Sequence, residues 1–415
     1  MVITVIGLGF VGLTTALGLA SKGHTVYGIE SDNNKRTIIS SGKIPFYEPF
    51  MQPQLEQLLN KKLFIRSEQS GAVEQSECVF FCVGTPFGTD GSADLGYLKK
   101  AISDTMQLIS PELHPALAIK STVPAGTLQN DISPMLEEMG FIPGTSFELV
   151  NNPEFLREGF CWKDFIEPDR IVIGASSDKG FEILERVYSG FDAPIVKVST
   201  NTAEFIKYLS NTFLATMISY ANEMADFART LGNIDIIKAF SVLHNDRRWE
   251  NNTMSSYVYP GCGYGGYCLP KDTNAMLYIG KKYNKNMKIL SAVIETNNEI
   301  PLRIAEIMVS SVGKNAVAGI LGLSFKPFTD DVRDTSAAKI IRKLNEMGYK
   351  RILVYDPIAQ EEFLKAYPEL DVIACGSSDE VVNGSDTVGI VTAWPEFSVY
   401  KSNPKVTDFR YMAEK

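Results

Sequence analysis

The sequence contains only three histidines and six cysteines among its 415 residues, and both types are scattered along the chain. No histidine stands at metal-ligand spacing from a cysteine, so we expect no metal site. Few, dispersed cysteines are typical of reduced thiols and do not indicate the disulfide framework of a small secreted protein. Neither a bound metal nor disulfide cross-links are therefore predicted to stabilise this fold.

Long apolar segments are missing as well, since no run of about 18 or more apolar residues could cross a membrane. The amino terminus leads directly into strand-like sequence, without the basic segment that precedes a signal core. The formal net charge of -9 argues against nucleic-acid binding, because nucleic-acid-binding domains are usually basic. We expect a cytoplasmic globular protein that binds neither nucleic acid nor a membrane.

The amino-terminal segment carries a pattern typical of dinucleotide binding. The apolar residues Val2 to Ile6 predict a buried parallel strand, and G-x-G-x-x-G follows at 7–12 before a helical stretch. In this context the first glycine allows a tight turn, the second admits a pyrophosphate, and the third lets the helix pack on the strand. The residues predicted to bind a cofactor here are Gly7, Gly9, Phe10, Val11 and Gly12. A plain strand-turn-helix unit is the alternative.

Glu30 ends the second predicted strand, Thr25 to Ile29, at about the spacing from the glycines where a ribose-binding acid is expected. Its carboxylate would repel the 2′-phosphate of NADP, so NAD is the predicted cofactor. Lys35 is the counter-argument, although it could equally contact the adenosine side of the cofactor or solvent.

Four more strands are predicted in this half of the chain, at 78–83, 116–120, 148–150 and 170–174, and the last of them should be the final strand of the domain. Ligands of an open parallel sheet lie at the carboxyl ends of its strands. Thr85 and Thr122 both follow such ends. Glu154 and Glu158 follow the next strand, where they are either a general base with its helper or solvated surface residues.

A long helix is predicted from about residue 202 to residue 231, because apolar residues recur at three- and four-residue steps. This apolar stripe would be a core or a subunit-interface seam, and the helix suits both a domain connection and a dimer contact. Lys207 and Asn211 lie off the stripe and share one helix face. They are either functional residues or an exposed lysine and asparagine.

The glycine-rich segment 261–267 leads into Cys268, Pro270 and Asp272. Proline is favoured in the first turn of a helix, so a helix should begin near Cys268, where its dipole favours a thiolate. Asp272 lies one turn along the same face. A nucleophilic sulfur near a carboxylate suits covalent catalysis, whereas a structural cysteine beside an exposed aspartate is the alternative.

The carboxy-terminal segment repeats the α/β pattern, with strands predicted at 316–321, 352–355 and 387–391. It lacks G-x-G-x-x-G, but Lys326 with neighbouring backbone N–H groups, together with Arg333, could bind a different anionic nucleotide. The predicted fold class is therefore α/β, with two Rossmann-like doubly wound domains joined by a long central helix.

The order of these motifs resembles the UDP-glucose/GDP-mannose dehydrogenase family over essentially the whole chain. The matching pieces are GLGFVG at 7–12, VGTP at 83–86, STVPAG at 121–126, NPEFLREG at 152–159, the helix with Lys207 and Asn211, GYGGYCLPKD at 263–272 and FKPFTDDVR at 325–333. The resemblance implies an NAD-binding domain at 1–200, a helical dimerisation domain with the catalytic cysteine loop at 201–312, and a UDP-sugar-binding domain at 313–415. It also implies a homodimer.

The resemblance further implies that a nucleotide sugar, most closely UDP-glucose, is oxidised at its C6 alcohol to a carboxylate in two NAD-dependent steps. Cys268 would attack the intermediate aldehyde to form a thiohemiacetal, and a second hydride transfer would give a thioester that water releases as the acid. Lys207 and Asn211 would bind the C6 oxygen. The implied catalytic residues are Cys268, Lys207, Asn211, Asp272, Thr122 and Glu154.

The same resemblance assigns the binding residues. Those implied to contact NAD, besides the glycine motif, are Glu30, Lys35, Thr85, Thr122, Glu158 and Arg333. Those implied to contact the nucleotide sugar are Glu154, Phe155, Leu156, Arg157, Lys207, Asn211, Arg248, Tyr257, Gly261, Gly265 and Lys326. Arg248 would reach the substrate of the partner subunit.

Several alternatives remain open at this point. In the family, a histidine directly before the cysteine tends to mark enzymes for 2-acetamido sugars, and a serine is common in GDP-mannose enzymes. Tyr267 stands here and favours UDP-glucose over GDP-mannose or a UDP-hexosamine. A one-step β-hydroxyacid dehydrogenase shares a Rossmann domain, a long helix and a catalytic lysine, but would form one NADH per substrate instead of two. A non-catalytic nucleotide-sugar sensor would need neither Cys268 nor Lys207.

Overall fold

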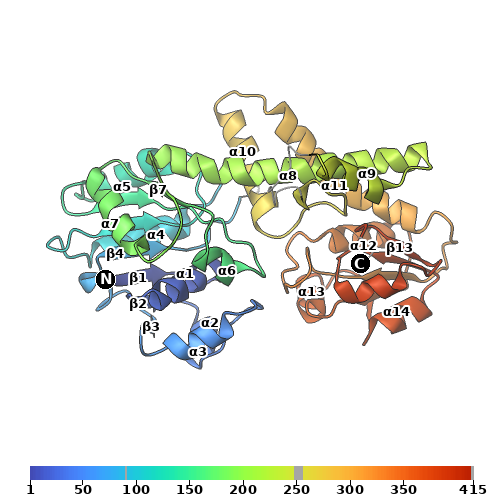
Figure 1. The fold of residues 1–415 in the computed structure, drawn as a ribbon, viewed down its shortest axis with the longest axis horizontal. Helices are drawn as coiled ribbons and strands as arrows, with labels where there is room; N and C mark the ends of the chain where they lie inside the picture. The colour runs from blue at the N-terminus through green and yellow to red at the C-terminus, as the bar shows by residue number, and fades with distance from the viewer. Residues whose placement is uncertain (89–90, 247–255, 413–415) are drawn as a thin grey trace. The chain divides into compact units, whose positions relative to one another are not determined.

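The computed structural model describes residues 1–88, 91–246 and 256–412 and divides into two compact units, Met1–Leu209 and Ser210–Lys415 (Figure 1). Each unit contains one sheet with helices packed on it. The long helix α8, Thr200–Leu231, carries the chain from the first unit into the second. The predicted fold class, two Rossmann-like α/β folds joined by a long helix, is confirmed.

Unit 1 is built on an eight-stranded sheet in the order β3-β2-β1-β4-β5-β6-β7-β8. Its strands are β1 Val2–Ile6, β2 Thr25–Ile29, β3 Leu63–Arg66, β4 Cys78–Phe81, β5 Ala116–Ile119, β6 Glu148–Asn151, β7 Ile171–Gly174 and β8 Ile195–Val198. Neighbouring strands are parallel except β6 and β7, which are antiparallel. The prediction that the strand at 170–174 is the last of this domain was wrong, because β8 pairs with β7 and extends the sheet.

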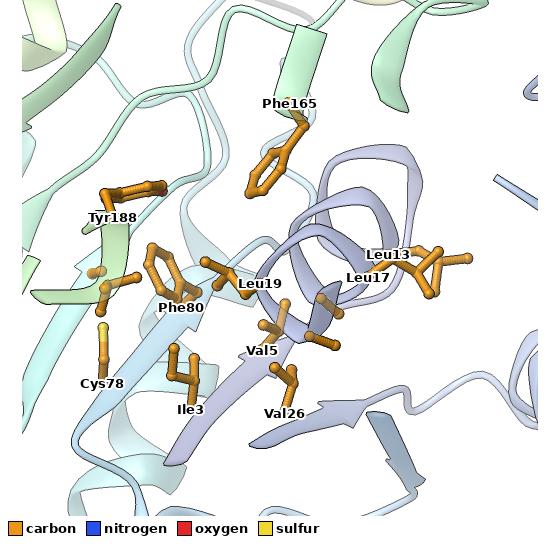
Figure 2. Close-up of a cluster of buried hydrophobic side chains, with 14 of the residues drawn as sticks. Ile3, Val5, Leu13, Leu17, Leu19, Val26, Cys78, Phe80, Phe165 and Tyr188 are labelled. Atoms are coloured by element: carbon orange, nitrogen blue, oxygen red, sulfur yellow. The ribbon is translucent and has the colours of Figure 1, made fainter. Parts of the chain in front are cut away.

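The helices of unit 1 cover both faces of this sheet. They are α1 Phe10–Ser21, α2 Asn33–Ser40, α3 Gln52–Leu58, α4 Gly96–Met106, α5 Ser133–Glu138, α6 Cys161–Ile166 and α7 Asp178–Tyr188, with short turns at Val73–Gln75 and Leu128–Ile132. Because alternate strand residues point to opposite faces, Val5 and Phe80 pack against Leu19 of α1 (Figure 2), whereas Val79 and Phe81 face α4 and α5. Two apolar layers therefore hold the carboxyl ends of the strands in fixed positions.

Unit 2 combines helices with a second, five-stranded parallel sheet in the order β11-β10-β9-β12-β13. Its strands are β9 Ala318–Leu321, β10 Ile352–Tyr355, β11 Ile373–Ala374, β12 Thr387–Ile390 and β13 Val406–Asp408. Its helices after α8 are α9 Ile236–His244, α10 Cys268–Lys282, α11 Lys288–Met308, α12 Ser336–Glu346, α13 Gln360–Ala366 and α14 Ser378–Gly384, with a short turn at Pro395–Tyr400. In the described part of the chain, no helix is both long and apolar enough for a membrane span.

The apolar stripe predicted along α8 divides into two kinds of position. Met217 is buried against α9 and its neighbours, so it belongs to the core. Ile206 and Met224 of the stripe are partly buried, whereas five other large apolar side chains leave about half of their surface exposed; they are Leu209 53%, Phe213 52%, Tyr220 54%, Phe227 56% and Leu231 60%. Such a contiguous exposed apolar row is uncommon on a helix that faces only water.

Candidate functional site

The glycine motif forms the turn between β1 and α1. Gly7 has φ +88, and a Cβ at Gly12 would lie 1.7 Å from the Gly7 carbonyl oxygen, so neither position accepts a side chain without rearrangement. A Cβ at Gly9 would meet no atom within 4 Å, which leaves open space directly before Phe10, where α1 begins. Open backbone at a helix amino terminus fits the pyrophosphate of a dinucleotide.

Glu30 follows β2 and is 5% exposed. Its two carboxylate oxygens accept hydrogen bonds from the backbone N–H groups of Leu8 (3.1 Å) and Asp32 (2.9 Å), so the acid ties the glycine turn to the end of β2. Lys35 Nζ lies 3.5 Å from Glu30 Oε2. The structure therefore pairs Lys35 with the predicted ribose-binding acid and does not direct it solely to solvent.

Thr85 and Thr122 meet at the carboxyl edge of the first sheet. The Thr85 hydroxyl donates to the Thr122 carbonyl oxygen at 2.8 Å. Ser121 adds hydrogen bonds to the carbonyl oxygens of Phe81 and Val83, so the loops after β4 and β5 are tied together. This is the edge at which ligands of an open parallel sheet bind.

Lys207 and Glu154 form a buried ion pair in unit 1, with Nζ 2.9 Å from Oε1 and side-chain exposures of 6% and 7%. Glu154 Oε2 accepts from the Leu156 N–H at 2.7 Å, and Lys207 Nζ lies 5.6 Å from the centroid of the Phe155 ring. Burial alone would raise the pKa of the Glu154 carboxyl, but the adjacent Lys207 ammonium brings that pKa below its usual value. The pair is thus charged, and both members have defined positions.

The other residues of this segment are placed differently. Arg157 is exposed and forms a two-pronged pair with Asp164, from Nε at 2.9 Å and Nη2 at 2.6 Å. Glu158 is half-buried. A ligand that contacts Arg157 would therefore meet a guanidinium that is already paired with Asp164.

Cys268 is the first residue of α10, as predicted from the proline two residues later, and its side chain is exposed. Asp272, one turn further, is fully buried. One carboxylate oxygen of Asp272 lies 2.6 Å from Lys271 Nζ, and the other accepts from Asn211 Nδ2 at 2.5 Å. An accessible thiol at a helix amino terminus is thereby placed on the same helix as a carboxylate whose two oxygens are both held.

The glycines before Cys268 are required by close backbone contacts. Gly263 has φ +101, and an added Cβ would lie 2.7 Å from Asn297 Oδ1, which accepts from the Tyr264 N–H. A Cβ at Gly265 would lie 2.5 Å from the Asp334 carbonyl oxygen. The loop therefore rests on α11 on one side and on the segment after β9 on the other.

Tyr267 and Arg333 also meet in this region. The Arg333 guanidinium carbon lies 4.6 Å from the Tyr267 ring centroid, and its nitrogens bind Asp331 at 2.9 and 2.5 Å. Lys326 is half-buried, with Nζ 5.4 Å from the Phe325 ring. These cations remain at the carboxyl edge of the second sheet, where an anionic ligand is expected.

Of the remaining predicted residues, Tyr257 is half-buried beside α8 and α9, and the Gly261 N–H donates to Asn222 Oδ1 at 2.6 Å. Arg248 lies outside the described residues. Among the described residues, no group of three or more His, Cys, Asp or Glu side chains could hold a metal ion.

Sequence reasoning missed Lys271, Asn297 and Arg410. Lys271 is 3% exposed and pairs with its neighbour Asp272, whereas adjacent helix residues do not usually face each other. Arg410 packs on Gly261, where an added Cβ would come within 2.5 Å of its Nη1. The only signal for Lys271 was its place inside the glycine-cysteine motif, and Arg410 had none.

Comparisons with known proteins agree with this geometry. Residues 1–192 match the NAD binding domain of the UDP-glucose/GDP-mannose dehydrogenase family, residues 201–299 its central domain and residues 319–415 its UDP binding domain. The UDP-glucose 6-dehydrogenase TuaD of Bacillus subtilis is 35% identical over 95% of this chain and 84% of its own length.

Solved structures show the same relationship. A UDP-glucose dehydrogenase from the archaeon Pyrobaculum islandicum superposes with a TM-score of 0.91 at 34% identity, covering 99% of this chain and 94% of that one. A UDP-D-ManNAc dehydrogenase from Pyrococcus horikoshii has a TM-score of 0.85 at 27% identity, covering 100% and 97%. On sequence, fold and site geometry together, the chain belongs to the UDP-glucose/GDP-mannose dehydrogenase family.

Proposed function

We propose that this NAD-dependent enzyme oxidises the C6 alcohol of UDP-glucose to the carboxylate of UDP-glucuronate. The observation that carries the proposal is the exposed Cys268 at the start of α10, on one helix with the buried, doubly held Asp272. An oxidation that stopped at an aldehyde would need no thiol. Similarity to UDP-glucose 6-dehydrogenases over most of both chains supports the choice of sugar nucleotide.

The residues of unit 1 fit the cofactor. The open space at Gly9, the amino terminus of α1 and the buried carboxylate of Glu30 match the pyrophosphate and ribose of NAD. Bound NAD supplies the hydride acceptor for each oxidation. The further residues proposed to contact it are Phe10, Val11, Lys35, Thr85, Thr122, Glu158 and Arg333.

In the first oxidation, Lys207 and Asn211 are proposed to bind the C6 oxygen, since they lie one turn apart on α8. Lys207 offers a buried ammonium whose position is set by Glu154, and a fixed cation stabilises an alkoxide that develops nearby. The ionised Glu154 carboxylate is proposed to accept the alcohol proton, directly or through water. The product of this step is the aldehyde.

In the second oxidation, the Cys268 thiolate adds to the aldehyde carbon to form a thiohemiacetal. Loss of a hydride and a proton converts this adduct into a thioester. Water then cleaves the C–S bond, releases the carboxylate and returns the thiol, with Asp272 and Thr122 proposed to organise water and proton transfer. Two hydrides leave for each alcohol oxidised, so two NADH form.

The residues of the NPEFLREG segment, the glycine loop and the segment after β9 are each proposed to contact the nucleotide sugar. These residues are Glu154, Phe155, Leu156, Arg157, Tyr257, Gly261, Gly265 and Lys326. The domain limits proposed above, 1–200, 201–312 and 313–415, assign NAD to the first and the UDP-sugar to the last. We also propose a homodimer formed through the exposed apolar row of α8, in which Arg248 reaches the substrate of the partner subunit.

The proposal is tested by NADH stoichiometry with identification of the product. UDP-glucose should yield two NADH and UDP-glucuronate, at a higher kcat/KM than GDP-mannose or UDP-N-acetylmannosamine. One NADH per substrate would favour a one-step dehydrogenase and would refute the covalent route. Two NADH with a preference for another sugar nucleotide would retain the chemistry and overturn the choice of UDP-glucose.

A further inference from the structure

A buried lysine near the Glu154–Lys207 pair has no part in the proposed chemistry. Lys120 directly follows β5 and is 4% exposed. Its Nζ donates to Asn152 Oδ1 at 3.0 Å and to the Tyr188 hydroxyl at 3.4 Å. A buried ammonium that is hydrogen-bonded to an amide and a phenol is costly to desolvate, so an explanation for its presence is needed.

Three aromatic rings surround this ammonium. Nζ lies 5.9 Å from the centroid of Phe80, 5.9 Å from that of Phe165 and 6.0 Å from that of Tyr188. These rings come from β4, α6 and α7 and lie over the same face of the first sheet (Figure 2). Aromatic faces attract a desolvated cation and restrict where it can move.

Asn152 connects this ammonium to the proposed active site. Its Oδ1 also accepts from the Tyr188 hydroxyl at 2.6 Å, and its Nδ2 donates to the Val172 carbonyl oxygen at 2.8 Å. All of these contacts agree on one orientation of the amide. Asn152 stands two residues before Glu154. A fixed Asn152 therefore restricts the backbone position from which the Glu154 side chain extends.

The charged groups around Lys120 also link it to Glu154. The groups that face it are the thiols of Cys78 and Cys82, the Tyr188 hydroxyl, the Glu154 carboxylate and the Lys207 ammonium. Burial raises the pKa of the thiols and of the Tyr188 hydroxyl, so these three groups are neutral near pH 7. Glu154 is then the anion among these groups, and the Lys120 charge favours its ionised form.

We propose that Lys120 is a positioning residue for the oxidation: its ammonium fixes Asn152, and its charge adds to that of Lys207 in holding the ionised Glu154 carboxylate in place. This inference rests on the proposed function, in which that carboxylate accepts the alcohol proton. It assigns the cation after β5 to the support of a general base and not to the stability of the sheet alone.

The consequence appears in the pH profile. Burial lowers the pKa of Lys120 to about 8, so its charge is present at pH 7 and is lost as the pH rises through that value. The wild-type enzyme should show a fall in kcat with a midpoint near pH 8. Lys120→Met keeps the length and apolar contacts of the side chain but removes the charge at every pH.

Lys120→Met should lower kcat at pH 7 by roughly tenfold while KM changes less than about threefold. The ratio of wild-type to variant kcat should then decline towards one between pH 7 and pH 9. Tyr188→Phe, which keeps the Lys120 charge, should show the same fall of kcat near pH 8 as the wild type. A ratio that does not vary with pH would assign Lys120 a purely structural role and would overturn the proposal.

Lys120→Gln is the second variant, because it keeps an N–H donor for Asn152 without the charge. A loss of activity at pH 7 as large as that of Lys120→Met, which likewise declines as the pH rises towards 9, supports the role of the charge. Full activity of Lys120→Gln at pH 7 would show that hydrogen bonding alone suffices and would contradict the proposal.

A measurement without substrate separates this inference from the proposed function. The Leu156 N–H donates to Glu154 Oε2, so its hydrogen exchange reports whether the carboxylate is in place. Exchange at Leu156 should be about tenfold faster in Lys120→Met than in wild type at pH 7, after correction for intrinsic rates. Unchanged exchange would refute the positioning role even if two NADH form. Faster exchange in a protein that does not form two NADH would reject only the proposed function.

Discussion

Cys262 and Cys268 stand at the two ends of one glycine-rich loop but have opposite environments. Cys262 is 1% exposed, and burial raises the pKa of its thiol to about 11, so it stays protonated at neutral pH. Cys268 is exposed at the first position of α10, where the helix dipole favours a thiolate. Position along the loop therefore decides which sulfur can act as a nucleophile.

Cys268→Ser should lower the kcat for formation of the acid at least about a thousandfold, because a hydroxyl without a base is a poor nucleophile. Product analysis by mass spectrometry and NADH absorbance check this. Cys262→Ser is the matched control and should retain activity within about threefold. Acid production by Cys268→Ser at the wild-type rate would exclude the covalent intermediate.

Glu30→Gln should weaken the discrimination against NADP by roughly tenfold to a hundredfold, since it removes a buried negative charge while retaining a hydrogen-bond acceptor. Lys35, 3.5 Å from the carboxylate in the wild type, then becomes available to a 2′-phosphate. The measurement is the ratio of kcat/KM for NAD to that for NADP. Asp32→Asn, at the amino terminus of α2, should leave the ratio unchanged. An unaltered ratio in Glu30→Gln would place the selectivity elsewhere.

Residues that stand at a fixed spacing from a sequence motif could be located from the sequence. Residues that are distinguished only by burial in the folded protein could not. Glu30 follows the glycine motif at a spacing set by one βαβ unit, so counting along the chain located it. Lys120 and Lys271 are buried, although lysine side chains usually lie at the surface. Lys120 is hydrogen-bonded to Asn152, which is distant in the sequence. Lys271 is paired with Asp272, and adjacent residues of a helix do not usually face each other.

At the scale of elements, α8 is attached to the loop that carries Thr122. Glu204, 1% exposed on α8, accepts from the backbone N–H groups of Gly126 at 2.6 Å and Leu128 at 2.9 Å. Burial raises the pKa of this carboxyl to about 7, despite the two N–H donors, which lower it. The first turns of the long helix and the loop after β5 are therefore held together by one carboxyl group.

The raised pKa of Glu204 predicts a specific dependence of stability on pH. Between its ordinary value of 4.5 and about 7, the folded protein binds a proton that the unfolded chain releases, so this contribution to the free energy of unfolding is present at low pH and lost as pH rises to 7. Its full size is about 3 kcal/mol. In urea unfolding, the advantage of wild type over Glu204→Gln should shrink by up to that amount between pH 4.5 and pH 8. A difference between wild type and Glu204→Gln that is constant with pH would contradict the assignment.

Elements were predicted well where their own residues determine them. The start of α10 at Cys268 followed from the glycines and Pro270, and β1 and β2 have the predicted bounds. β8 was missed because only four residues form it and Lys197 is exposed within it, which is typical of an edge strand but also of a loop. The two exposed residues of β11 give even less of a pattern.

For the molecule as a whole, the two sheets use equivalent acids differently. Glu30 follows β2 and Asp356 follows β10, the second strand of each α/β fold. Asp356 Oδ2 accepts from the Leu323 and Ser324 N–H groups and from Trp394 Nε1, so it closes the carboxyl edge of the second sheet. Glu30 accepts hydrogen bonds from two backbone N–H groups, whereas Asp356 also accepts from the Trp394 side chain.

The exposed apolar row of α8 gives the proposed dimer a testable consequence for catalysis. If Arg248 completes the substrate site of the partner subunit, a dimer of Arg248→Ala with Cys268→Ser contains one site with both residues intact. Random pairing then restores about a quarter of wild-type activity when the two variants are co-expressed, although each is inactive alone. Adding Phe213→Glu to both chains places a charge in the apolar row, where Phe213 is 52% exposed, and should abolish the recovery while light scattering reports monomers. Activity equal to the average of the two parents would show that each subunit uses its own Arg248, and the dimer would then have no part in forming the site.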